Sequence, residues 1–383
     1  MNLRFFTFIV TISSLFLSSG FYLGSRISVA FPEYDTLLLW LAVFAVIILQ
    51  IAGPLFYRVL PDHNNRYFVL RWIMFMCMGI ASSALLYMMA TDFIVFGLKI
   101  LWPAHQHLYP QVGVAAAISL VLVTNIVGMA QVAHGPRLYH VKVPLPKAYN
   151  FLHGLKIAQI SDLHVGPTIG RRYAQRVVNL VNGQKPDLIA LTGDIVDGSP
   201  DQLRHGIEPL RNLVAKYGTF SVLGNHEFYW NAQSWMETYR ALGMSLLNNS
   251  HQIISHNDSK FLIAGVPDRK ASRMLDNLSS SPSQALDGAP GDVFKILLAH
   301  QPSSHEDAEK AGFHLQLSGH THGGQFFPFT LIVRLAEKFI KGLYQHKGLW
   351  VYVNRGTGYW GPPIRFLVPA EVTIISLHSD GQV

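Results

Sequence analysis

The feature that most constrains the fold of this chain is a set of five short apolar runs, each followed directly by polar side chains. The runs are residues 155–160, 188–191, 220–223, 296–299 and 314–317. Each has the length of a buried strand. The polar side chains that follow them are Asp162, His164, Asp194, Asn225, His226, His300, His320 and His322. Because open α/β folds bind ligands at the carboxyl ends of their strands, we expect these side chains to converge on one site.

The converging side chains offer carboxylate, imidazole and amide donors and no thiolate. This set suits Mn, Fe or Zn rather than a soft-metal or iron–sulfur site. It has more donors than one tetrahedral zinc needs and enough for two six-coordinate ions with water. Asp194 is central among the clusters in sequence, so its carboxylate is the candidate bridge. Two ions about 3.5–4 Å apart can hold a phosphoester oxygen and lower the pKa of a bridging water.

Each polar cluster also has an ordinary structural interpretation. A single Asp-x-His or Asn-His pair, such as Asp162 with His164, is more often a loop or helix-cap pair than a metal site. The five clusters together favour a metal site, because so many unpaired buried polar groups would be costly.

The first third of the chain is apolar. Half of all residues are hydrophobic and only 14% are charged, and residues 1–132 hold few of those charges. Four apolar stretches, 5–30, 37–56, 68–90 and 112–132, are close to the roughly 20 residues that span a bilayer. We therefore predict a transmembrane region of about four helices in 1–132, a proline-containing linker in 133–154, and a separate α/β domain in 155–383.

The basic residues next to the apolar stretches indicate an orientation. With four spans, one side of the membrane carries Arg4, Arg58, Arg66, Arg71, Arg137, Lys142 and Lys147, and the other carries Arg26 and Lys99. Basic loops remain in the cytoplasm, so this distribution predicts a multi-pass protein of the cell membrane with a cytoplasmic α/β domain. The first stretch can also be interpreted as a secretory signal. Its cleavage would leave three spans and place the domain outside.

The motifs in the α/β domain resemble those of the calcineurin-like metallophosphoesterase superfamily. They are Asp162-Leu163-His164, Gly193-Asp194-Ile195-Val196-Asp197, Gly224-Asn225-His226-Glu227, His300 and Gly319-His320-Thr321-His322. The resemblance covers roughly residues 155–377. Residues 354–358 and 362–365 further resemble the membrane-associated bacterial members. The resemblance implies a four-layer sandwich in which two central sheets are flanked by helices.

The resemblance also implies roles for individual residues. One metal ion would be held by Asp162, His164, Asp194 and His322, and the other by Asp194, Asn225, His300 and His320. His226 would act as general acid or donate a hydrogen bond to a phosphate oxygen, and Asp197 would orient it. Glu227 has no expected ligand role, and we expect a solvated or capping carboxylate there.

One departure narrows the expected activity. In the Ser/Thr protein phosphatases of the superfamily an arginine follows the second aspartate of Gly-Asp-x-x-Asp, whereas here Gly198 follows Asp197. We therefore expect hydrolysis of a phosphodiester or pyrophosphate by a metal-bound hydroxide, with lipids and lipid precursors among the candidate substrates. The alternatives are a general phosphodiesterase for soluble nucleotides and a non-catalytic membrane module that senses metal or has a structural role.

The stretch that follows the last metal motif, residues 326–340, is apolar and contains Arg334 and Lys338. It predicts either a lip at the membrane surface that admits a lipid headgroup, or a helix docked on the core. We expect membrane lipids and a phosphoester substrate as partners. Nucleic acid is not expected, because the net charge of +7 is its only support and the interleaved aromatic and basic residues of strand binding are missing.

Overall fold

The computed structural model describes residues 3–59, 67–257, 259–271 and 278–379, and the chain divides into two compact units. The helical unit consists of residues 1–131 together with the short segments 326–329 and 361–367. The sheet unit consists of residues 132–325, 330–360 and 368–383. The two units are described separately below.

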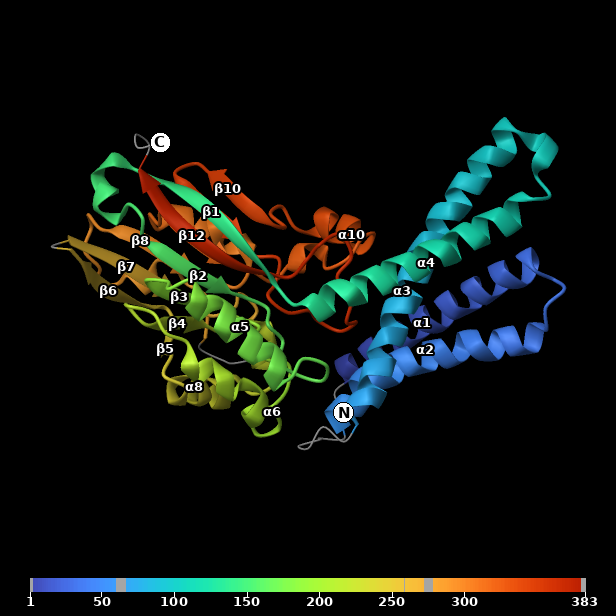
Figure 1. Ribbon diagram of the computed structural model, residues 1–383, viewed down its shortest axis with the longest axis horizontal. Coiled ribbons are helices and arrows are strands. Elements are labelled where there is room, and N and C mark those ends of the chain that lie inside the picture. The colour runs from blue at the N-terminus through green and yellow to red at the C-terminus, as the bar shows by residue number, and fades with distance from the viewer. Residues whose placement is uncertain (1–2, 60–66, 258, 272–277, 380–383) are drawn as a thin grey trace. The chain divides into compact units, whose positions relative to one another are not determined.

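The described residues of the helical unit form four long helices (Figure 1). They are α1 (Leu3–Ala30), α2 (Thr36–Val59), α3 (Phe68–Leu101) and α4 (Tyr109–His134), and a short 3-10 turn, Pro103–His105, separates α3 from α4. Among the residues that the structure describes, three segments are long and apolar enough to cross a membrane, namely Thr36–Tyr57, Phe68–Leu101 and Tyr109–His134. The predicted N-terminal helical region is confirmed.

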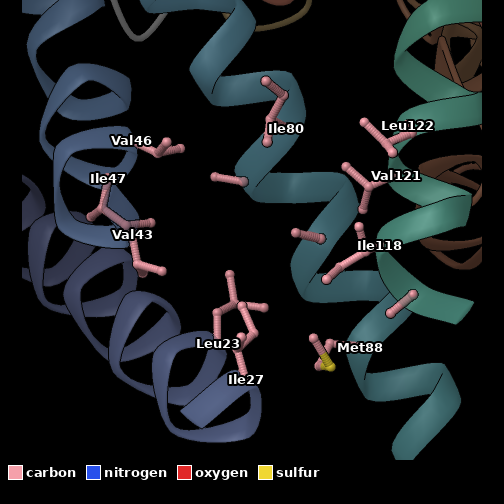
Figure 2. Close-up of a pocket in the computed structure, with 13 residues that line it drawn as sticks. Leu23, Ile27, Val43, Val46, Ile47, Ile80, Met88, Ile118, Val121 and Leu122 are labelled. Carbon is pink, nitrogen blue, oxygen red and sulfur yellow. The ribbon is translucent and has the colours of Figure 1, made fainter. Parts of the chain in front are cut away.

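An apolar cavity of about 270 Å³ lies between the four helices (Figure 2). Its thirteen lining residues are all aliphatic or methionine and include Leu23 on α1, Val43 on α2, Ile80 on α3 and Leu122 on α4. Apolar cavities of about 150 Å³ stay dry and accept small hydrocarbons. This cavity is therefore suited to hydrocarbon rather than water.

Segment 361–367 packs directly on α3 and α4 inside the helical unit. Ile364 is fully buried, in a cluster with Met76 and Phe326. The backbone N–H of Arg365 donates to the carbonyl of Gly128 on α4 over 3.1 Å. A Cβ atom at Gly128 would lie 3.0 Å from Cβ of Ile364, so this close approach needs a glycine.

The described residues of the sheet unit form two six-stranded mixed sheets (Figure 1). The first sheet, in spatial order, contains β1 (Arg137–Leu145), β12 (Glu371–Ser379), β2 (Lys156–Ile160), β3 (Leu188–Thr192), β4 (Thr219–Val222) and β5 (Ser245–Leu246). The second contains β10 (Gly342–His346), β11 (Leu349–Val353), β9 (Leu315–Ser318), β8 (Phe294–Leu298), β7 (Ser259–Gly265) and β6 (Ser250–His256). Neighbouring strands β2, β3 and β4 run parallel, as do β7, β8 and β9.

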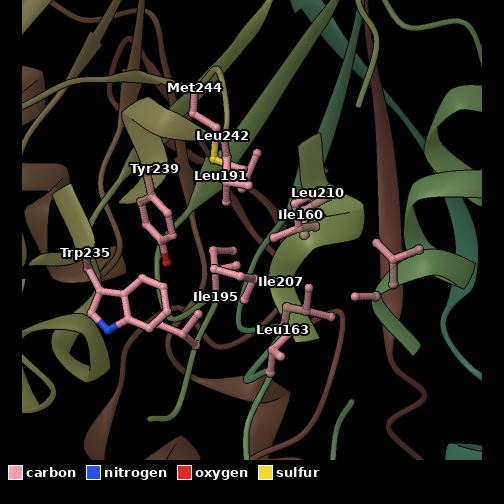
Figure 3. Close-up of a cluster of buried hydrophobic side chains, with 14 of the residues drawn as sticks. Ile160, Leu163, Leu191, Ile195, Ile207, Leu210, Trp235, Tyr239, Leu242 and Met244 are labelled. Carbon is pink, nitrogen blue, oxygen red and sulfur yellow. The ribbon is translucent and has the colours of Figure 1, made fainter. Parts of the chain in front are cut away.

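The two sheets pack face to face, and helices cover their outer faces. These helices are α5 (Arg171–Gly183), α6 (Pro200–Ile207), α7 (Asn225–Tyr229), α8 (Ala232–Ala241) and α9 (His305–Lys310). The helix α10 (Phe329–Ala336) has no buried residue. Ile157 and Phe220 of the first sheet meet Ile263 and Ile296 of the second in one buried cluster. On the opposite face of the first sheet, Trp235 of α8 belongs to a second buried cluster (Figure 3). The predicted four-layer sandwich is confirmed.

Residues 133–154, expected to form a linker, contain strand β1 and a 3-10 segment, Lys147–Leu152. β1 pairs in parallel with β12 along its whole length, from Arg137 opposite Glu371 to Leu145 opposite Ser379. Val143 and Leu145 alternate toward the core and are buried. Pro144 is tolerated because β1 is an edge strand, where one missing N–H leaves no ladder bond broken.

Candidate metal centre

Each of the five predicted strands ends at a loop that carries candidate metal ligands. β2 is followed by Asp162 and His164, β3 by Asp194, β4 by Asn225, β8 by His300, and β9 by His320 and His322. Backbone hydrogen bonds join the first two loops, because the N–H of Asp162 donates to Gly193 and that of His164 donates to Asp194 over 3.0 and 3.1 Å. The loops of both sheets therefore meet at one edge of the sandwich.

The backbone at the site is strained. Five of the candidate ligands have positive φ angles, namely Asp162 (50°), His164 (50°), Asp194 (52°), His320 (71°) and His322 (51°). Few non-glycine residues adopt this conformation, and it costs of the order of 1–3 kcal/mol each where it persists. Its repetition at one place indicates that the fold holds these side chains in fixed directions for a ligand.

Asp162, His164 and His322 form the first group of converging donors. The Nε2 atoms of His164 and His322 are 3.1 Å apart, and Nε2 of His322 is 3.5 Å from Oδ1 of Asp162. Asp162 is fully buried, and its other oxygen accepts a hydrogen bond from the Ser161 hydroxyl over 2.6 Å. These three residues match three of the four ligands expected for one ion.

Asp194, His300 and His320 form the second group. Nδ1 of His300 lies 2.8 Å from the carbonyl oxygen of Thr192, so Nδ1 must carry the proton that makes this hydrogen bond. In the neutral ring, Nε2 then presents its lone pair to Oδ2 of Asp194 at 3.1 Å and to Nδ1 of His320 at 3.2 Å. Facing lone pairs repel one another unless a cation lies among them.

Asn225, the remaining expected ligand of this second group, begins α7. Its Oδ1 is buried and has no hydrogen-bond partner among the described residues. An unpaired buried acceptor is costly, and an amide oxygen is a suitable metal ligand. The orphaned oxygen and the opposed lone pairs of the imidazoles both fit divalent cations, so the residues present fit the expected metal pair.

His226 lies between the two groups. Its Nε2 is 3.9 Å from Oδ2 of Asp194, and its Nδ1 is 3.1 Å from Oδ1 of Asp197. The indole N–H of Trp230 donates to the same Asp197 oxygen over 3.0 Å, which fixes that carboxylate. Burial opposes charging of His226, but the carboxylates of Asp194 and Asp197 outweigh it and raise its pKa to about 9. Cations bound at Asp194 would oppose that increase.

Glu227 has a larger structural role than its sequence suggested. The expected solvation is wrong, because the side chain is fully buried. Its carboxylate accepts hydrogen bonds from the backbone N–H groups of Asp194, Ile195 and Gly224, over 3.0, 2.8 and 2.7 Å, and from the Tyr239 hydroxyl over 2.8 Å. The expected capping role therefore extends to the turn that presents Asp194.

We predict that Gly319→Ala removes the metal while Gly170→Ala does not. A Cβ atom at Gly319 would overlap Oγ of Ser161 and Oδ2 of Asp162, whereas one at Gly170 would meet no atom within 4 Å. Displacing the groups around a ligand commonly costs about 10–100-fold in metal affinity. We expect the metal affinity of the purified Gly319→Ala protein to fall at least about tenfold. Inductively coupled plasma mass spectrometry of the dialysed protein would measure the loss of bound divalent metal. Equal metal content in the two folded variants would contradict this account of Asp162.

Known proteins that are similar to this chain in sequence include a phosphoesterase family and several metallophosphoesterases. The calcineurin-like phosphoesterase family matches residues 155–324. A transmembrane protein with metallophosphoesterase domain from Danio rerio is 35% identical over 270 residues, which are 68% of this chain and 62% of that protein. Metallophosphoesterases from Helicobacter pylori (36% over 230 residues, 60% of this chain and 61% of that protein) and Aquifex aeolicus (33% over 229 residues, 59% and 86%) are also similar.

The match spans less than two thirds of the Danio rerio and Helicobacter pylori relatives and most of the Aquifex aeolicus one. The relatives include animal as well as bacterial proteins, so the similarity is not confined to bacterial members. The family match covers all the candidate ligands, which the structure gathers at the ends of the strands. The chain belongs to the calcineurin-like metallophosphoesterase family.

Proposed function

We propose that this chain is a membrane-anchored phosphoesterase that hydrolyses phosphodiester or pyrophosphate bonds with two divalent ions. The observation that carries the proposal is that the two donor groups described above are joined by a third, formed by His164, Asp194 and His226, so that His164 and Asp194 are each shared between two groups. The apolar helices α2, α3 and α4 and the relatives described as transmembrane proteins support the membrane anchor.

In this proposal Asp162, His164, Asp194 and His322 hold one ion, and Asp194, Asn225, His300 and His320 hold the other. When bound, the ions would supply positive charge to the phosphoryl oxygens and lower the pKa of a water. The oxygen and nitrogen donors suit Mn, Fe or Zn. His226 would donate a proton to the leaving group or a hydrogen bond to a phosphate oxygen. Asp197 and Trp230 would fix the direction of its ring.

We predict that purified protein in detergent hydrolyses bis-p-nitrophenyl phosphate in the presence of Mn and that Asp194→Asn abolishes this activity. Asp194 lies in two of the three donor groups and is the expected bridging ligand in this proposal, so its loss should weaken both ion sites. We expect a fall in kcat/KM of at least about a thousandfold, which corresponds to about 4 kcal/mol of transition-state stabilisation. The matched variant is Asp187→Asn, because Asp187 caps β2 through the backbone of Lys156 outside the site. No turnover by the metal-loaded, folded wild type with any divalent ion would overturn the proposal.

The exposed helix α10 supports lipids or lipid precursors as the substrates. No residue of α10 is buried, and Leu331, Ile332 and Leu335 are 52%, 44% and 90% exposed. Phe339 and Ile340, which follow the helix, are buried in the sheet unit. The structure therefore divides the stretch into an exposed apolar helix and a core segment. An exposed apolar helix with Arg334 beside it is suited to a lipid surface.

We predict that Leu335→Asp impairs turnover of a lipid-like phosphodiester more than turnover of a soluble one. Withdrawing one leucine from lipid costs about 1.5–3 kcal/mol, which corresponds to about a tenfold to hundredfold loss of affinity for the lipid. The assay compares a long-chain fluorogenic phosphodiester in mixed micelles with bis-p-nitrophenyl phosphate in solution. Val214→Asp is the control, because Val214 is 68% exposed and lies outside α10. Equal effects on both substrates would favour the alternative, a phosphodiesterase for soluble nucleotides.

The sheet unit is proposed to lie in the cytoplasm, on the basis of the basic residues near the ends of the spans. Val214→Cys tests this orientation, since the chain has one other cysteine, Cys77, which is buried in α3. We expect a membrane-impermeant maleimide to label the variant in lysed cells and not in intact ones. The unsubstituted chain measures background labelling. Labelling of intact cells would place the domain outside, as cleavage of the first stretch would require.

A further inference from the structure

Two cationic side chains, those of Lys341 and Arg355, lie beside the loop that carries His320 and His322. A Cβ atom at Gly323, the residue after His322, would lie 3.4 Å from Cγ of Arg355 and 3.5 Å from Cδ of Lys341. Arg334, at the end of α10, is close enough to lower the pKa of the Lys341 ammonium. The two nearer cations therefore flank the backbone directly next to a candidate metal ligand.

The positions of these cations are fixed by their surroundings. The hydroxyl of Thr321, which lies between the two histidines, donates to the carbonyl of Ile340 over 2.6 Å and so attaches Lys341 to the loop. The Arg355 guanidinium lies 4.4 Å from the Tyr139 ring centre, and its Nε is 3.2 Å from Oε2 of the fully buried Glu371. These contacts hold Lys341 and Arg355 in place, whereas a basic side chain on an open surface is free to change its conformation.

The cluster has more positive than negative charge. Glu371 is the carboxylate paired with Arg355, and the described residues offer the Lys341 ammonium no hydrogen-bond or ion-pair partner. Burial, followed by Arg355 and Arg334, lowers the pKa of Lys341. A half-buried ammonium held near two guanidinium groups, with one carboxylate among them, is an electrostatically unfavourable arrangement that an anion would relieve.

We propose that Lys341 and Arg355 form a subsite that binds a second phosphoryl group, next to the one held at the metal ions. The proposal rests on the proposed function and narrows its substrates to compounds with two neighbouring phosphates, as in a pyrophosphate. The second phosphate can belong to a soluble substrate or to a lipid, because Arg334 lies on the exposed apolar helix α10.

Binding tests the subsite without requiring turnover. Isothermal titration of purified, metal-loaded protein in detergent compares UMP with the non-hydrolysable α,β-methylene analogue of UDP, which adds one phosphoryl group. A charge-assisted contact contributes about one to two powers of ten in affinity. We expect the wild type to bind the diphosphate analogue at least about tenfold more tightly than UMP. Lys341→Gln should remove most of this preference. Lys338→Gln, which changes an exposed lysine whose ammonium lies over the Phe339 ring, should keep it.

The outcomes separate this proposal from the proposed function. Equal affinity of the wild type for the two ligands, or a preference that survives Lys341→Gln, would overturn the subsite even if bis-p-nitrophenyl phosphate is hydrolysed. A preference lost in Lys341→Gln would support the subsite even if no turnover is found. A third arm repeats the titration in nanodiscs with and without phosphatidylglycerol. A Lys341 effect that appears only with the anionic lipid would assign the cluster to a lipid headgroup and overturn its role as a substrate subsite.

Discussion

The carboxylate of Asp194 is the group on which the rest of the site depends. Its Oδ1 accepts the backbone N–H of His226 over 2.8 Å, and its Oδ2 lies 3.1, 3.9 and 4.0 Å from nitrogens of His300, His226 and His164. A buried carboxylate needs compensating charge, because its transfer out of water is very costly. Protons or metal ions must supply that charge. Much of the surrounding structure holds Asp194 in place, including Glu227, whose four hydrogen bonds fix the turn after β3.

The convergence of the candidate ligands was predictable because its signal is local. Parallel strands covered on both faces are continuous apolar runs, so the end of each run marks the edge of the sheet and the next polar residues mark the site. The runs of β3 and β8 follow this rule most closely, whereas the runs of β2, β4 and β9 each contain one buried polar residue, namely Gln159, Ser221 and Gln316. The position of Asp197 beside His226 was implied by the motif resemblance and not by the apolar runs.

The features that the sequence did not reveal depend on contacts between distant residues. From the sequence alone, Glu227 fits a solvated or capping carboxylate. In the folded structure, the backbone N–H of Asp194 and the Tyr239 hydroxyl donate hydrogen bonds to it. The prolines of residues 133–154 predict a linker there. The strand β1, which contains Pro144, forms by pairing with β12, the last strand of the chain, and no local sequence signal indicates that pairing. The apolar pattern of residues 326–340 is compatible with a lip and with a helix docked on the core, because tertiary packing decides which side chains are exposed. In the structure Leu335 is exposed and Phe339 is buried.

The helices are more than an appended anchor, because the loops of the site lead directly into the helical unit. The Gln325 side chain donates to the carbonyl of Trp360 and accepts its N–H, each over 2.9 Å, and the Trp360 ring lies 5.9 Å from that of His226. Immediately after these two residues the chain enters the helical unit as segments 326–329 and 361–367. There Phe326 and Ile364 are 4% and 0% exposed, in a cluster with Met76 of α3. A chain lacking the helices would expose both side chains, each worth about 1.5–3 kcal/mol of burial. The two loops that carry Gln325 and Trp360 therefore continue directly into segments whose side chains are buried in the helical unit.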